Sequence, residues 1–170
     1  RGMRKGDVFA RMLPNLPEFA TAFYGVLAAG GVITTLNPLY KVDEIARQLE
    51  DSEARYLLTL PQLFDKALEA AAKHPLREVF VVGEIPGATP FSALLAADCT
   101  PPRIQVNPFE DLAVLPYSSG TTGLPKGVML THANLTAAVL SMTVDLPFGA
   151  GTVWLAILPF FHVAGMVCLL

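Results

Sequence analysis

Hydrophobic and polar positions along this chain change period repeatedly, which predicts strands and helices in alternation. Val8–Leu13 is a short apolar run that predicts a strand, and a proline follows it. Apolar residues then recur at helical spacing over Phe19–Leu27, until the glycine pair at 30 and 31 ends the predicted helix. Asn15 precedes this helix and is interpreted as its N-cap, with Pro17 near the first turn.

The same alternation continues along the following fifty residues. Strands are predicted at 32–36, 55–60 and 78–82, and helices at 43–51 and 61–74. Strand-then-helix units of this length are typical of an α/β fold built around a mainly parallel sheet.

The rhythm loosens between residues 83 and 108, where five prolines occur. This stretch is interpreted as a surface connection with one short helix around 91–97, and residues 83–111 as a connection between subdomains. Further strands are predicted at 113–117, 127–130 and 153–158, and a helix at 134–142.

Composition narrows the classes of function. Apolar residues make up 52% of the chain, so membrane spans were considered, but glycines and prolines interrupt the long uncharged stretches and no span is expected. Net charge is −3 without a basic run, which argues against nucleic-acid binding. Two cysteines, Cys99 and Cys168, make neither a disulfide framework nor a metal site, so a reducing, cytoplasmic setting is expected.

Residues 117–127, YSSGTTGLPKG, carry the clearest chemistry in the sequence. Glycines allow the backbone to approach a ligand closely, and successive free N–H groups form an anion site. Four hydroxyls and one lysine add donors and a positive charge suited to a polyphosphate. The segment is not a Walker A loop, because Pro125 and Gly127 replace the required glycine and hydroxyl residue. A solvated hairpin loop is the alternative interpretation.

The longer segment YSSGTTGLPKGVMLTHANL, residues 117–135, closely resembles the phosphate-loop signature of adenylate-forming enzymes. This superfamily includes acyl-CoA synthetases, 4-coumarate–CoA ligases, luciferases and peptide-synthetase adenylation domains. Three other segments agree in order and spacing: LPNLPEFATAFYGVLAAGGVITTLNPLY at 13–40, EIARQLEDSEARYLLT at 44–59 and LPFFHVAG at 158–165. Two segments, THANL at 131–135 and Phe-Phe-His at 160–162, resemble the CoA-ligase and luciferase branch of this superfamily.

The resemblance implies site residues and substrates. It assigns phosphate binding to a set of loop residues: Ser118, Ser119, Gly120, Thr121, Thr122, Gly123 and Lys126. It places His162 in the acyl-adenylate pocket and makes His162 and Lys126 the catalytic candidates; from the residues alone, a lone histidine in apolar company is more often a core residue. Ala164 stands where 4-coumarate–CoA ligases carry an aromatic residue. The implied substrates are a carboxylic acid, ATP and CoA, with Mg²⁺ held by a ligand outside this chain.

The chain is therefore interpreted as an incomplete portion, residues 1–170, of the N-terminal AMP-binding domain of an acid–CoA ligase, without the C-terminal domain. Both ends are expected to be cut, which would leave this piece inactive alone and expose apolar surface that favours self-association. Two alternatives stay open. One is a non-catalytic truncated relative, and the other is a luciferase-like or peptide-synthetase adenylation domain.

Overall fold

The computed structural model describes residues 2–96, 103–118, 123, 125–144 and 149–169. Its strands are β1 (Val8–Arg11), β2 (Val32–Thr35), β3 (Ala54–Thr59), β4 (Glu78–Val81), β5 (Thr89–Pro90), β6 (Leu112–Leu115), β7 (Tyr117–Ser118), β8 (Lys126–Gly127) and β9 (Leu130–Thr131). Its helices are α1 (Pro17–Ala28), α2 (Val42–Asp51), α3 (Phe64–Ala71), α4 (Ser92–Leu95), α5 (His132–Thr143) and α6 (Val163–Leu169), with a 3-10 turn at Pro61–Leu63.

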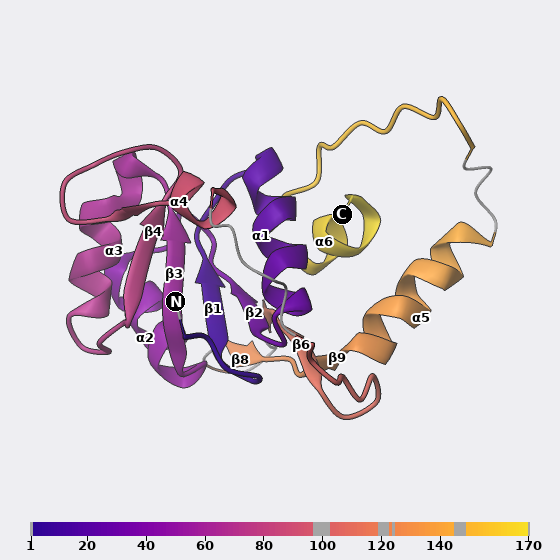
Figure 1. The fold of residues 1–170 in the computed structure, drawn as a ribbon, viewed down its shortest axis with the longest axis horizontal. Helices are drawn as coiled ribbons and strands as arrows, with labels where there is room; N and C mark the ends of the chain where they lie inside the picture. Colours follow the sequence, from indigo (N-terminus) through magenta and orange to yellow (C-terminus); the bar gives the residue numbers. More distant parts are fainter. Residues whose placement is uncertain (1, 97–102, 119–122, 124, 145–148, 170) are drawn as a thin grey trace.

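The described residues form one seven-stranded sheet in the order β5-β4-β3-β1-β2-β6-β9 (Figure 1). Every neighbouring pair in it is parallel except β6 and β9, which run antiparallel. Parallel neighbours need crossover connections, and α1, α2 and α3 supply them between β1 and β4. The predicted α/β fold with a mainly parallel sheet is confirmed.

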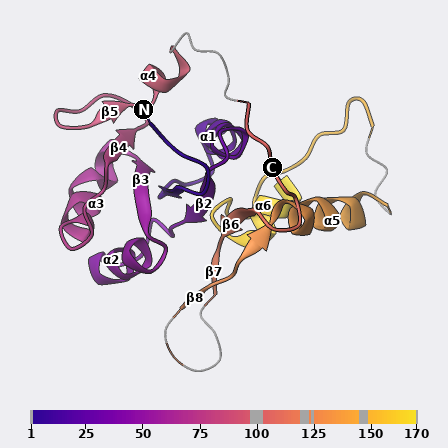
Figure 2. The ribbon, with the colours of Figure 1, turned by 60° about the horizontal axis from the view of Figure 1, so that its bottom comes forward.

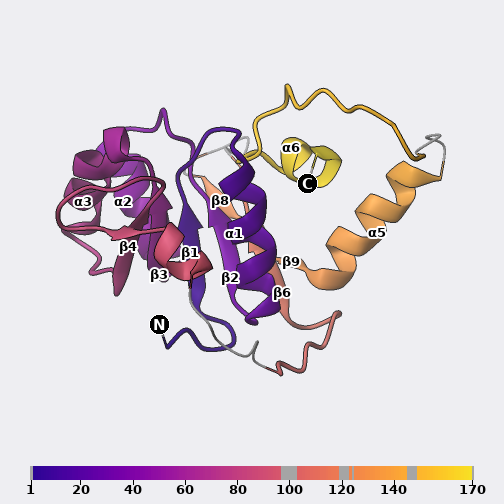
Figure 3. The same ribbon diagram turned by 45° about the horizontal axis from the view of Figure 1, so that its top comes forward.

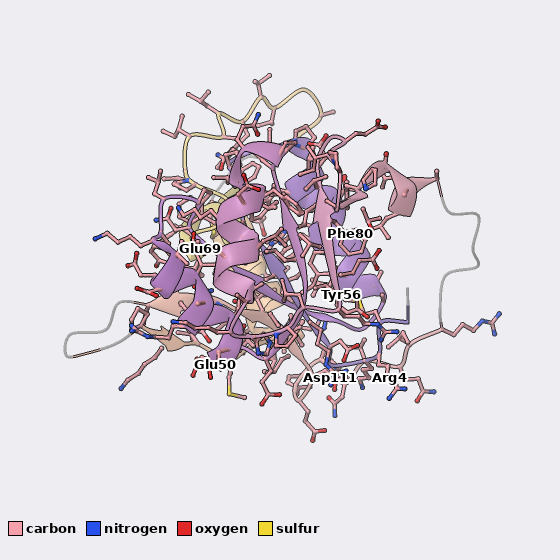
Figure 4. All side chains as sticks on the ribbon, turned by 90° about the vertical axis from the view of Figure 1, so that its left-hand side faces the viewer. Arg4, Glu50, Tyr56, Glu69, Phe80 and Asp111 are labelled. Atoms are coloured by element: carbon pink, nitrogen blue, oxygen red, sulfur yellow. The ribbon has the colours of Figure 1, made fainter. Side chains whose placement is uncertain are left out.

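Both faces of the sheet are covered by helices, which explains why its central strands are buried on both sides. Helices α2 and α3 lie on one face and α1 on the other (Figure 3). Apolar residues of α2 and α3 pack on the first face, and those of α1, with Phe91 and Met166 of α6, pack on the second. On the α1 face, the Phe9 ring stacks on Tyr56 and Phe80 at centroid distances of 5.9 and 5.8 Å (Figure 4 labels the last two).

Local sequence signals explain where two of the helices stop or start. After α1, Gly30 takes a φ of +76°, a conformation that L side chains rarely adopt, so the glycine pair ends the helix as predicted. Helix α5 starts after Thr131, whose hydroxyl accepts a hydrogen bond from the Asn134 N–H at 3.3 Å, while the Asn134 side chain accepts from the Thr131 N–H at 2.9 Å.

Some predictions about the second half are wrong. Val153–Leu158 is irregular and pairs with no strand among the described residues, and Val153, Leu155 and Ile157 are 93, 77 and 74% exposed. A strand needs a partner as well as β-branched residues, and the described chain offers this segment none. The predicted strand at 127–130 is divided between β8 and β9, and neither β5 nor α6 was anticipated. Among the described residues, no helix is long and apolar enough to span a bilayer.

Candidate functional site

The carboxyl ends of β1, β2 and β6 lie at one edge of the sheet, because these strands are parallel neighbours. In α/β sheets this edge is the usual position of a ligand site. Segments leaving β2 and β6 line a cavity of about 410 Å³ there, together with the residues that precede α6. Its lining, which defines the site cavity, is Thr35, Asn37, Tyr40, Pro116, Tyr117, Ser118, Val128, Leu130, Phe161, His162 and Val163.

The base of the predicted phosphate loop is a short antiparallel hairpin, β7–β8 (Figure 2). Ser118 pairs directly with Lys126, and both residues are exposed. Of the other predicted loop residues, Gly123 is described and has a φ of +115°, which explains the need for glycine there. Ser119, Gly120, Thr121 and Thr122 lie outside the described residues.

Tyr117 links this hairpin to helix α2. Its hydroxyl donates a hydrogen bond to the carboxylate of Asp51, the last residue of α2. Its ring lies across the hairpin over Gly127, where an added Cβ would come within 3.2 Å of the ring. Burial, the hydrogen bond and the negative charge of Asp51 all raise the pKa of Tyr117 above its ordinary value, so the phenol stays protonated.

Lys126 lies on a neighbouring cavity rather than in the site cavity. This second cavity, about 380 Å³, is lined by Tyr40, Glu44, Arg47, Gln48, Asp51, Tyr117, Pro125 and Lys126. The rings of Tyr40 and Tyr117 are common to both cavities. The fold therefore brings Ser118 and His162 to one cavity and sets Lys126 next to it.

His162 sits in a turn immediately before α6. Its N–H donates to the Pro159 carbonyl at 3.1 Å, and its carbonyl accepts from the Met166 N–H at 2.9 Å. The ring nitrogen Nδ1 accepts from the Ala164 N–H at 3.3 Å, so a neutral ring carries its proton on Nε2. The exposed side chain lines the site cavity and is not a core residue. Its Nε2–H is the group that can donate to an oxygen atom in the cavity.

Gly165 has a packing role. A Cβ at this position would overlap the Pro159 carbonyl, so only glycine allows α6 to start so close to the His162 turn.

The prediction that Asn15 caps α1 is wrong. Leu16 occupies the N-cap position, and no side chain caps the helix there. The Asn15 side chain instead reaches the segment before His162, where Oδ1 accepts from the Phe160 N–H at 2.7 Å. Its Nδ2 donates to the carbonyls of Ala156 and Leu158 at 3.1 and 2.8 Å. Local sequence patterns give no information about partners more than 140 residues away along the chain.

Comparison with known proteins identifies the family of this chain. The family model described as AMP-binding enzyme matches residues 1–170. The chain belongs to the AMP-binding enzyme family. Members similar to it include 4-coumarate–CoA ligase 3 of Oryza sativa subsp. japonica, 42% identical over 95% of this chain and 30% of that protein. A long-chain-fatty-acid–CoA ligase of Bacillus subtilis is 34% identical over 99% of this chain and 36% of its own length.

Solved structures of the family give the same result for the fold. A long-chain-fatty-acid–CoA ligase from Archaeoglobus fulgidus superposes with a TM-score of 0.88 at 33% identity, covering 98% of this chain and 33% of that one. MbtA of Mycobacterium smegmatis gives a TM-score of 0.90 at 31% identity and covers 32% of its own chain. The chain thus spans about a third of the length of the family members it matches. Its fold is that of the N-terminal domain of adenylate-forming enzymes.

Proposed function

We propose that this chain is the phosphate-handling part of an ATP-dependent acid–CoA ligase. In this reaction a carboxylate attacks the α-phosphorus of ATP, forming acyl-AMP and releasing pyrophosphate. The thiol of CoA then attacks the acyl carbon, forming the thioester and releasing AMP. The observation that supports the proposal most is that Ser118, at the base of the phosphate loop, and His162 line the same cavity.

Binding of the β- and γ-phosphates is assigned to Ser118–Gly123 together with Lys126. Ser118 and Lys126 face each other across the hairpin, so a hydroxyl and an ammonium group stand at its exposed base. Backbone N–H groups of a glycine-containing loop are suitable partners for phosphate oxygens, and lysine adds a mobile positive charge. These groups offset the charge that accumulates on pyrophosphate as it leaves.

His162 is assigned to the acid side of the reaction. With Nδ1 accepting from the Ala164 N–H, Nε2–H is the available donor of a side chain that lines the site cavity. A donor in that position stabilises negative charge on a carboxylate or α-phosphate oxygen in the transition state. The mechanism needs no side-chain nucleophile, because the substrate carboxylate is itself the nucleophile.

The described residues contain no cluster of three or more His, Cys, Asp or Glu side chains that could hold a metal ion. Mg²⁺ accompanies ATP in phosphoryl chemistry, and none of the described residues is assigned to it. The coverage of about a third of each relative supports the view that residues 1–170 are an incomplete portion of one AMP-binding domain. We expect these residues alone not to form acyl-AMP at a useful rate.

Pyrophosphate exchange in the complete enzyme that carries this chain tests the proposal. Lys126→Ala should slow exchange about ten- to a hundred-fold, because a hydrogen bond to a charged group contributes about 1.5–3 kcal/mol. The matched control is Lys73→Ala, which removes an exposed lysine paired with Asp43 at 3.7 Å; neither residue lines either cavity. Exchange unaffected by Lys126→Ala would contradict the assignment. Formation of acyl adenylate without acyl-CoA would instead favour a luciferase-like or peptide-synthetase adenylation domain.

A further inference from the structure

The segment before His162 is held by unusual means. Residues 153–158 form no helix or strand, their side chains are exposed, and they take part in no strand pairing among the described residues. Within residues 153–158, therefore, neither strand pairing nor burial of apolar side chains fixes the backbone. The position of the imidazole must depend on other contacts.

Asn15 supplies three of these contacts from the connection between β1 and α1. Its amide nitrogen donates to two carbonyls, those of Ala156 and Leu158, and its amide oxygen accepts from the Phe160 N–H. A side-chain amide is suited to this task because it carries two donors and an acceptor on one rigid group. A carboxylate of the same shape would place a negative oxygen against the two carbonyls.

Thr35 holds the next residue from the end of β2. Its hydroxyl donates to the Phe161 carbonyl at 2.6 Å, and its side chain is buried. The Phe160 ring packs against Phe19 of α1 at a centroid distance of 5.5 Å. The two residues directly before His162 are thus held through an N–H group, a carbonyl and a ring, all by partners from the first 35 residues.

We propose that Asn15 and Thr35 are positioning residues that hold the 156–161 segment so that the His162 imidazole faces the site cavity. Their effect on acyl-AMP formation passes through His162, and this part rests on the proposed function. Arg11, the last residue of β1, pairs in register with Thr35, the last residue of β2, so Thr35 ends one strand and Asn15 lies in the connection that follows its neighbour. The position of His162 is therefore set relative to β1 and β2 of the sheet.

A double-mutant cycle in the complete enzyme tests the kinetic part. Asn15→Leu should lower kcat for pyrophosphate exchange about ten- to a hundred-fold with little change in KM for ATP, because a displacement of about 1 Å has that effect on an oriented group. In a His162→Ala background the same substitution should have almost no further effect. Equal losses in both backgrounds would overturn the proposal.

Thr35 gives an independent test that preserves shape. Thr35→Val, which removes only the hydroxyl, should lower kcat in the same direction, and Thr35→Ser should restore it. Asn107→Ala is the matched control, since the Asn107 side chain serves only the nearby Phe109 N–H at 3.2 Å among the described residues. Failure of serine to restore activity, or an equal loss from the control, would contradict a positioning role.

Amide hydrogen exchange separates this proposal from the proposed function. In Asn15→Leu, the Phe160 N–H should exchange about five- to ten-fold faster, whatever His162 does in the reaction. Where Asn15→Leu does not fold, Thr35→Val with exchange measured over residues 160–162 takes its place. If exchange is faster but His162→Ala leaves pyrophosphate exchange unchanged, the role of His162 in the reaction is refuted, while the inference that Asn15 holds the 156–161 segment stands. Unchanged exchange would overturn the inference itself.

Discussion

The hydrogen bond from Tyr117 to Asp51 gives a stability prediction that depends on the hairpin base alone. Tyr117→Phe removes the hydroxyl and leaves the ring over Gly127 in place. Hydrogen bonds to charged groups contribute about 1.5–3 kcal/mol, and a value near 1 kcal/mol is expected here, because Asp51 is exposed and Tyr117 is half-buried. In a domain of this size that loss lowers the melting temperature by about 2–4 °C.

Tyr56→Phe is the matched control for this substitution. The Tyr56 hydroxyl is buried and has no hydrogen-bond partner in the described part of the chain, so its removal should not lower the melting temperature. Asp51→Ala completes a cycle with Tyr117→Phe, and the cycle is needed because a carboxylate at a helix C-terminus is itself unfavourable. The reasoning would be refuted if Tyr117→Phe had the same melting temperature as wild type. It would also be refuted if the losses of stability in Tyr117→Phe and Asp51→Ala were additive in the double mutant.

Burial of Tyr117 and its bond to Asp51 together make the stability of the fold depend on pH in a known direction. The pKa of Tyr117 is raised in the folded protein, so folding favours the protonated phenol. Its contribution is fully present below the unfolded pKa of about 10 and is lost as pH rises toward the folded value. The difference in melting temperature between wild type and Tyr117→Phe should therefore shrink above about pH 10. A difference that stays constant to higher pH would contradict this assignment.

Two further substitutions test other features of the fold. Arg11 is fully buried, and its Nε and Nη2 have no acceptor in the described part of the chain. Arg11→Met should therefore raise the free energy of unfolding by about 1–4 kcal/mol, measured in urea at an unchanged m value. A decrease of more than about 1 kcal/mol in that free energy would count against this. Ile157→Lys should reduce self-association of residues 1–170 in sedimentation, because it places a charge in the exposed apolar 153–158 segment, and an unchanged association state would show that another surface is responsible.

Local sequence patterns predicted the first half of the fold well because burial there follows a short period. Ile45 and Leu49, four residues apart, are both fully buried on the α2 face, and the glycine pair after α1 ends the helix as expected. The Val153–Leu158 prediction failed for the opposite reason. Its residues have strand character, but pairing is a property of two segments, and no local pattern reveals whether the second one is present.

The candidate site divides in the same way. Ser118, Lys126 and His162 belong to contiguous motifs, so the sequence could point to them, and the fold brings Ser118 and His162 to one cavity. Asp51 was missed because it lies 66 residues from Tyr117 and approaches it only when α2 packs beside the hairpin. The role of Asn15 had one local signal, a polar side chain directly after a proline. The same signal is typical of a helix cap, so the sequence could not distinguish the two roles.

The two sides of the site are fixed to the same scaffold by different chemistry. On the phosphate side, a phenol and a carboxylate join the hairpin to α2, and on the acid side Asn15 and Thr35 hold the backbone before His162. Asp51, Asn15 and Thr35 belong to the first 51 residues, whereas the groups assigned to the reaction belong to residues 118–162. A change in the packing of β1, β2 and α2 would therefore move the phosphate loop and the histidine relative to each other. In a reaction that depends on in-line attack, such a change should lower kcat without touching any group that contacts substrate.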